Sequence, residues 1–315
     1  MTLAIKSVLT SQVDFTGEFP VSNKTVALWR FNETAPDSNN MIADASGFNR
    51  DFYVSAWSGT SASFPASRLG RFFRQNIINP TSEKTHLIAT NDGGFFTDLG
   101  EKIVVGGWIN PTTYSIGQTF IPIFNTRQGP GQPIFYISLY QGRPRLMLYN
   151  ASGTLIYDQS ETPPITLKNN CWYFFASIIE VNNKQVQNLL CDRSDGVVWQ
   201  SPIRSFTDEL NKSCTADIVM GMHANTYYYA GGFDDWFYEK DSDLNMDDLI
   251  FYFKSSLLAN GGDSSSDVDA IKEAGAVLLK ETDGSYPSSG ILYTTAALCN
   301  LSGTGRVSVT SEYTA

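Results

Sequence analysis

The stretch that decides the fold is Gly231-Gly232-Phe233-Asp234-Asp235-Trp236-Phe237-Tyr238, followed shortly by Leu244-Asn245-Met246-Asp247-Asp248-Leu249. The first part is rich in aromatic residues, which favour β-strands. In the second part, Asn245 is a good N-cap, and Asp247 and Asp248 fall in the first helical turn, where the helix dipole favours negative charge. The sequence therefore predicts a strand that runs into a capped helix.

Similar strand patterns recur along the chain before this point. We expect strands at residues 26–31, 103–109, 135–140 and 145–149, and a further pair at 171–179 and 187–190. They are separated by breaks rich in Gly, Asn and Ser, and no helix is expected between them. Many short strands without intervening helices favour a mainly β fold, an antiparallel β-sandwich, with short helices only near the C-terminus.

Three segments are expected along the 315 residues. Residues 1–24 form an N-terminal arm, 25–258 form the sandwich, and 259–315 form a linker, a short helix at about 268–279 and a β-hairpin from 291–298 and 306–311. An isolated hairpin is marginally stable in water. We therefore expect it to pack on the main domain or on a neighbouring subunit. We also expect the protein to be an oligomer or part of an assembly.

Charge and hydropathy argue against several partners. The net charge is -10 and no long basic run is present, whereas binding to nucleic acid needs clustered Lys and Arg. An anionic membrane surface is disfavoured for the same reason. No stretch approaches the ~20 apolar residues of a membrane-spanning helix, and the N-terminus lacks the pattern of a signal peptide.

The four cysteines do not form a metal-binding motif. Cys171 and Cys191 lie almost symmetrically about the expected turn at 181–184, so they could face each other across a β-ladder. The alternative is that both are buried, reduced thiols, which suits a chain without a secretion signal. The sequence leaves this choice open.

Five segments occur in an order that resembles a laminin-G-like domain, a jelly roll of the concanavalin A type found in bacterial and phage surface proteins. They are residues 26–33, the turn 44–47 (Asp-Ala-Ser-Gly), 104–111, 171–176 and 233–238. The resemblance covers roughly three quarters of the chain. It implies a jelly-roll sandwich that binds surfaces and glycans more often than it catalyses reactions.

The resemblance also implies a possible metal. Some domains of this class hold a structural calcium ion, which needs several oxygen ligands at once. Asp44 in a turn and Asp234 near the last strand are the candidates. The alternative is that both carboxylates cap turns by accepting backbone hydrogen bonds.

A glycan site needs aromatic faces for sugar rings beside polar groups for hydroxyls. Two loops offer such groups, and the alternative is that the tyrosines belong to the core. The candidate glycan-binding residues are Asn225, Tyr227, Tyr228, Tyr229, Arg127 and Gln128.

Catalysis is poorly supported, and we expect the chain not to be an enzyme. The Glu-x-Asp-x-x-Glu pattern of glucanases with this fold is absent. Asp234 and Asp235 are adjacent, so on a regular strand they would point to opposite faces. His86 and His223 stand outside known catalytic motifs.

The function that fits these expectations is a bacteriophage virion structural protein, in the tail or decorating the capsid, that displays a lectin-like domain toward cell-surface glycans. Such a protein assembles in the host cytoplasm with other virion proteins and acts outside the cell after lysis, which would reconcile the fold with the missing export signal. Two alternatives stay open. One is a structural cement or spacer without a ligand. The other is a polysaccharide-cleaving enzyme that uses exposed acids such as Asp192 or Asp195.

Overall fold

The computed structural model describes residues 18–55, 62–67, 70–76, 85–91, 95–96, 98–112, 115, 117, 120–126, 134–159, 163–212, 214–223, 227–259, 276–277, 291–294 and 298–300. The chain separates into two compact units. One spans Val21–Leu249 and contains the sandwich; the other comprises both chain ends, Met1–Pro20 and Ile250–Ala315. The three-segment division expected from the sequence stays a prediction.

One layer of the sandwich is a nine-stranded sheet, called sheet A here. All its neighbouring strands pair antiparallel, and β1 (Thr25–Trp29) and β17 (Arg204–Ser205) pair with β21 and β15 beside the main path. The order along that path is β16 (Val198–Gln200), β15 (Gln185–Asp192), β14 (Tyr173–Glu180), β9 (Lys102–Pro111), β21 (Gly231–Lys240), β7 (Phe73–Gln75) and β4 (Ala62–Ser63).

The other layer is an eight-stranded antiparallel sheet, called sheet B. Its order is β13 (Leu155–Gln159), β12 (Arg143–Tyr149), β11 (Phe135–Tyr140), β10 (Phe120–Asn125), β18 (Ile218–Met220), β8 (His86–Ala89), β3 (Phe52–Ser55) and β2 (Met41–Ile42). Two short hairpins accompany the sheets: β5 (Ala66–Ser67) with β6 (Gly70–Arg71), and β19 (Met222–His223) with β20 (Tyr227–Tyr228).

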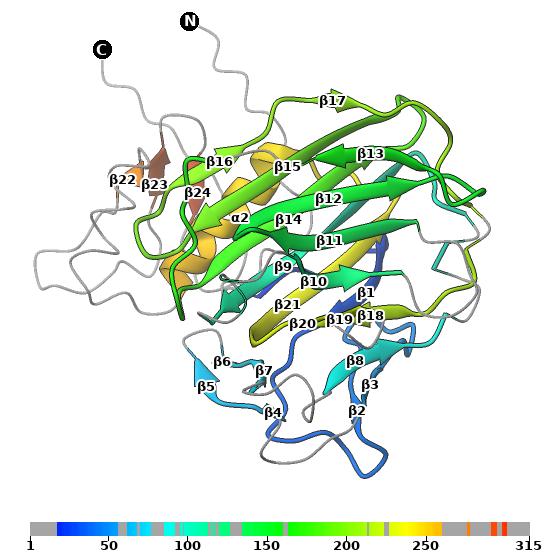
Figure 1. Ribbon diagram of the computed structural model, residues 1–315. Helices are drawn as coiled ribbons and strands as arrows, with labels where there is room; N and C mark the ends of the chain where they lie inside the picture. Colours follow the sequence, from blue (N-terminus) through cyan, green and yellow to red (C-terminus); the bar gives the residue numbers. More distant parts are fainter. Residues whose placement is uncertain are drawn as a thin grey trace, which may run out of the picture. The chain divides into compact units, whose positions relative to one another are not determined.

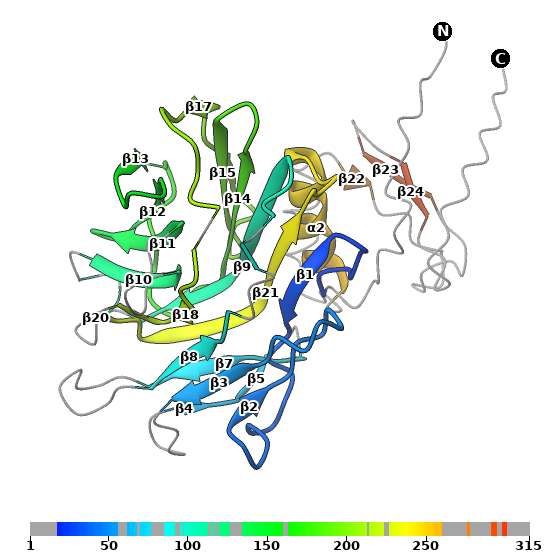
Figure 2. The same cartoon turned by 90° about the vertical axis from the view of Figure 1, so that its right-hand side faces the viewer.

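The core lies between the two layers (Figures 1 and 2). Alternate residues of each strand point into it, as the pleat of a β-strand requires. The Trp236 ring of β21 stacks at 5.2 Å on Phe124 of β10, and Phe124 stacks in turn at 5.8 Å on Phe135 of β11. The first contact joins sheet A to sheet B, and the second continues the stack within sheet B. The mainly β, antiparallel sandwich expected from the sequence is therefore confirmed.

Strand β21, which contains the stretch Gly231–Tyr238, has a β-bulge that the sequence did not predict. Asp234 is paired with Trp108 and Phe237 with Gly106, so Asp235 and Trp236 together face the single residue Gly107. Asp235 has φ +48°, the left-handed conformation found at many bulges. An added Cβ on Gly107 would lie 2.5 Å from Cγ of Trp236, so this position needs glycine for close packing.

Helix α2 (Met246–Ala259) begins as the sequence predicted. The Asn245 side chain accepts hydrogen bonds from the backbone N–H groups of Asp247 (2.8 Å) and Asp248 (3.2 Å). The Asp248 carboxylate in turn accepts one from the N–H of Asn245 at 2.9 Å. This reciprocal arrangement satisfies three donors at the helix start that would otherwise lack partners.

The second unit corrects two expectations. It contains a three-stranded sheet of β22 (Ala276–Val277), β23 (Ile291–Thr294) and β24 (Leu298–Asn300). The expected strand 291–298 is thus not one strand: its two ends belong to β23 and β24, which pair antiparallel, so that Ile291 pairs with Asn300. Ala276–Val277 is a strand where the helix at 268–279 was expected; the rest of that helix and residues 306–311 lie outside the described residues.

Candidate glycan-binding surface

The three tyrosines predicted to bind a glycan lie in different environments. Tyr227 is 45% exposed, whereas Tyr228 and Tyr229 are fully buried. Tyr228 packs in a small apolar cluster with Met222, and Tyr229 stacks on Phe233 at 4.5 Å. Burial raises the pKa of the Tyr229 hydroxyl well above its usual value. Tyr228 and Tyr229 therefore offer no ring face to a ligand and leave the candidate set.

The other three predicted residues, Asn225, Arg127 and Gln128, lie outside the described residues. Tyr227 alone among the six is placed on an accessible surface. It belongs to β20, which together with β19 lies beside β10 of sheet B.

The strand register places a set of side chains on the outer face of sheet B. Along β11, Phe135, Ile137 and Leu139 belong to the core, so Tyr136, Ser138 and Tyr140 point to the opposite face. Cross-strand pairing then aligns two outer rows. They are Phe120–Tyr140–Arg143 and Pro122–Ser138–Arg145, each running over β10, β11 and β12.

Four rings gather at one end of this face. The imidazole of His223 lies edge-on to Phe120 at 5.7 Å and to Tyr136 at 5.1 Å, and parallel to Tyr227 at 6.3 Å. Phe120 also contacts Tyr227 at 5.5 Å. A hydrogen bond of 2.9 Å joins the Tyr136 hydroxyl to Nδ1 of His223. Buried Tyr136 thereby fixes the orientation of the half-buried imidazole.

A charged pair completes the same face. Arg145 of β12 forms a two-pronged ion pair with Asp158 of β13, with Nε–Oδ1 at 2.7 Å and Nη2–Oδ2 at 2.5 Å. The Arg145 guanidinium also lies 4.7 Å from the ring centre of Tyr140. The hydrogen bonds to Asp158 raise the pKa of Arg145 further, so this side chain stays charged.

We call this set the Tyr227 surface. It offers apolar ring faces beside hydroxyl, imidazole, guanidinium and carboxylate groups that can exchange hydrogen bonds with a polar ligand. Its members are Phe120, Tyr140, Arg145, Asp158, His223 and Tyr227, and the buried Tyr136 lies beneath His223. The sequence pointed only to Tyr227, although the alternation along residues 135–140 could also have placed Tyr136 and Tyr140 on one face.

Asp44, one of the two candidate metal ligands, accepts hydrogen bonds from the protein itself. Asp44 accepts hydrogen bonds from the backbone N–H groups of Leu28 (2.9 Å), Ser46 (2.9 Å) and Arg50 (3.0 Å), and from the Ser46 hydroxyl (2.6 Å). These four bonds are those of a carboxylate that caps a turn. The residues that the structure describes contain no group of three or more His, Cys, Asp or Glu able to hold a metal ion. A calcium site at Asp44 and Asp234 stays a prediction.

The acidic residues considered for catalysis are placed differently from the expectation. The bulge breaks the strand alternation at Asp234 and Asp235, so the expectation that they point to opposite faces does not hold. Both residues are buried. Nη1 of Arg30 lies 3.7 Å from Oδ1 of Asp235. Asp192, considered an exposed acid, is buried and accepts hydrogen bonds from the N–H and hydroxyl of Ser194.

Cys171 and Cys191 are free thiols, as is Cys214. The β14–β15 register explains why the first two are not bonded. Cys191 pairs with Phe174 across the ladder, and Cys171 precedes β14. The side chain of Cys299 lies outside the described residues.

Among the described residues, no helix is both long and apolar enough to cross a bilayer. No protein-family model matches the sequence, and no curated protein matches it. Solved structures do resemble it in fold. The receptor binding domain of botulinum neurotoxin D has a TM-score of 0.54 at 12% identity, over 78% of this chain and 54% of that one. The binding domain of Paraclostridial Mosquitocidal Protein 1 has a TM-score of 0.52 at 15% identity, over 77% and 53%.

A third structure is the ligand binding domain of botulinum neurotoxin serotype D in complex with N-acetylneuraminic acid, with a TM-score of 0.53 at 13% identity, over 75% of this chain and 52% of that one. The chain thus spans about half the length of the binding domains it resembles. At these identities the likeness shows the fold alone. The chain is a β-sandwich of the kind present in these toxin binding domains, and the laminin-G relationship stays a prediction.

Proposed function

We propose that this chain is a lectin-like domain that binds cell-surface glycans through the Tyr227 surface. The observation that carries the proposal is the half-exposed Tyr227 ring, which contacts Phe120 and His223; the Arg145–Asp158 pair lies farther along the same face of sheet B, beside Tyr140. Such a surface combines an apolar platform with fixed polar groups, the combination by which binding sites orient small ligands.

The chemistry of sugars matches this arrangement. One face of a pyranose ring presents C–H groups, which can pack on an aromatic ring, while its hydroxyls need donors and acceptors around the rim. Tyr227 supplies the ring and His223 a polar group beside it, while the charged pair next to Tyr140 can bind the hydroxyls of a further sugar unit. Because Tyr136 holds the imidazole in place, little side-chain entropy is lost when a ligand binds.

The fold comparisons give independent support. The similar structures are binding domains, one of them in complex with N-acetylneuraminic acid. They also support binding without catalysis, which we propose here as well. Incubating any bound polysaccharide with the protein tests this point. Release of new reducing ends, lost on substitution of the exposed acid Asp195, would identify an enzyme instead.

The first experiment is a glycan array probed with the purified protein and with a Tyr227→Ala variant. The proposal expects binding to at least one glycan class and a weaker signal for the variant. Binding by neither protein, with both folded, would favour the alternative of a structural cement or spacer.

The biological setting is a separate proposal. We propose that the domain is displayed on a bacteriophage particle among other virion proteins; its support is the sequence resemblance to phage surface domains. The gene neighbourhood tests it. Adjacent capsid, portal or tail genes would support it, whereas a polysaccharide-utilisation cluster would contradict it.

A further inference from the structure

A concave site lies on the other sheet, away from the Tyr227 surface. It is a hollow of about 230 Å³ on the outer face of sheet A, near the start of α2. Its floor comes from the ends of β9, β14 and β15, and one wall comes from the segment that leads into the helix. The lining includes Lys102, Glu180, Asn183, Gln185, Ile203 and Asn245.

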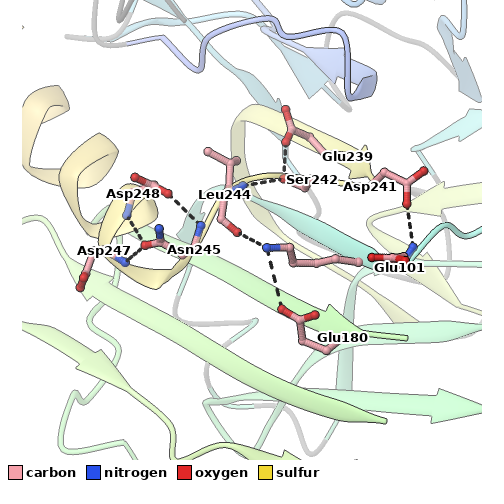
Figure 3. A network of polar contacts seen from close by, with 10 residues as sticks. Glu101, Glu180, Glu239, Asp241, Ser242, Leu244, Asn245, Asp247 and Asp248 are labelled. Carbon is pink, nitrogen blue, oxygen red and sulfur yellow. Dashed lines mark hydrogen bonds and ion pairs between the residues drawn. The ribbon is translucent and has the colours of Figure 1, made fainter. Parts of the chain in front are cut away.

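An ion pair between two lining residues lies at the floor of this hollow, and Figure 3 shows Glu180 and Leu244 in the polar network around it. The Lys102 ammonium lies 3.8 Å from the Glu180 carboxylate and donates a 3.1 Å hydrogen bond to the Leu244 carbonyl. An ammonium group has three N–H donors, so these two contacts leave one for a ligand. The same contacts tie the segment before α2 to β9 and β14, so the hollow has a preformed wall and floor.

Amide side chains face the hollow beside this pair. Asn183 and Gln185 have no side-chain hydrogen bond to any residue that the structure describes. Each amide carries two donors and one acceptor oxygen. Ile178, Ile203 and Met246 add apolar surface to the lining, and Ile203 is 61% exposed. The hollow therefore places the amide side chains of Asn183 and Gln185 near the exposed apolar side chain of Ile203.

The charges around the hollow and its volume limit the class of ligand that it can bind. Glu180 offsets Lys102, and the first-turn acids Asp247 and Asp248 follow the lining residue Met246, so the surroundings disfavour an anion. The helix start does not attract an anion either, because Asn245 already accepts the N–H groups of both acids. The hollow is also smaller than the roughly 300–1,000 Å³ of sites for drug-sized ligands, so it suits a single small ring.

We propose that this hollow is a second carbohydrate subsite that takes one neutral, hydroxyl-rich sugar ring. Asn183, Gln185 and the third N–H of Lys102 bind its hydroxyls, and Ile203 packs on its C–H face. The subsite goes beyond the proposed function, because it lies on sheet A and shares no residue with the Tyr227 surface. Two sites on different sheets would let one domain contact two sugar units.

Titration of the isotope-labelled protein with galactose, glucose and N-acetylglucosamine tests this inference. The NMR signals of the Asn183 and Gln185 side-chain amides should shift at millimolar concentration of at least one of these sugars. Gln185→Ala should weaken that response about three- to tenfold, the effect of one lost hydrogen-bonding group. Asn39→Ala, a substitution of another exposed amide on the sheet B side of the chain, serves as the matched control.

Three outcomes would overturn the inference. The first is no shift of either amide with any of the three sugars. The second is a response to glucuronate or glucosamine without one to the neutral sugars. The third is a response that Gln185→Ala and Asn39→Ala change equally. Failure of the proposed function looks different, because it is read from the signals of His223 and Tyr227 in the same spectra.

Discussion

The Tyr227→Ala substitution removes the most accessible ring of the Tyr227 surface, and its effect can be estimated from the structure. An aromatic side chain carries roughly 200 Å² of surface. The 45% exposure of Tyr227 therefore leaves roughly 90 Å² for a ligand, worth about 2 kcal/mol at ~25 cal/mol per Å² if all of it were covered. A sugar ring covers one face, so we expect a loss of about 1 kcal/mol, or a five- to tenfold increase in Kd.

Isothermal titration with the best glycan of the array measures this change. Tyr53→Ala is a matched control, because Tyr53 has nearly equal exposure, 42%, and lies on β3, three strands from β10 in sheet B. Tyr53→Ala should leave Kd unchanged, and both variants should unfold at similar temperatures. Equal losses in the two variants, or an unchanged Kd for Tyr227→Ala, would refute the assignment of this surface.

Three further predictions concern stability. Gly107→Ala should destabilise the fold by about 1–3 kcal/mol, because its Cβ would overlap the Trp236 ring, whereas Gly117→Ala, with nothing within 4 Å of the added Cβ, should change the denaturation midpoint little. Glu239→Ala should cost about 1–3 kcal/mol in urea unfolding, because its buried carboxylate accepts three hydroxyl hydrogen bonds; a loss under 0.5 kcal/mol, on the order of an ordinary surface change, would contradict this. Burial raises the pKa of the Tyr173 hydroxyl to about 12, above its usual value near 10. The contribution of Tyr173 to stability should therefore be complete below pH ~10 and be lost as pH rises toward 12. Phenolate absorbance followed together with circular dichroism should show this ionisation accompanying unfolding, and ionisation of Tyr173 near pH ~10 in the folded state would disprove the prediction.

The strands with the clearest pattern were predictable from the sequence. Residues 135–140 alternate about a buried face and form β11 as expected, and Asn245 caps α2 as its position indicated. These features depend on neighbours within a few residues, which a single sequence displays directly.

The bulge in β21 was not predictable in the same way. Asp235 adopts φ +48° because Trp236 must lie over Gly107 of β9, more than a hundred residues earlier in the chain. No local residue pattern marks that register. The error about Asp234 and Asp235 followed from assuming a regular pleat.

The candidate surface shows the same limit. Tyr227 was chosen from its loop, but its partners Phe120, Tyr136 and His223 come from three separate segments that pairing brings together. The sequence could not distinguish Tyr227 from Tyr228, because both occur in one run of three tyrosines and only the packing of β20 decides which ring is buried.

The most direct test is a crystal structure of the protein with the glycan that binds best on the array. We expect the sugar to lie on the ring of Tyr227, within hydrogen-bond distance of His223 or of the Arg145–Asp158 pair. A glycan bound elsewhere, with the outer face of sheet B empty, would contradict the central claim.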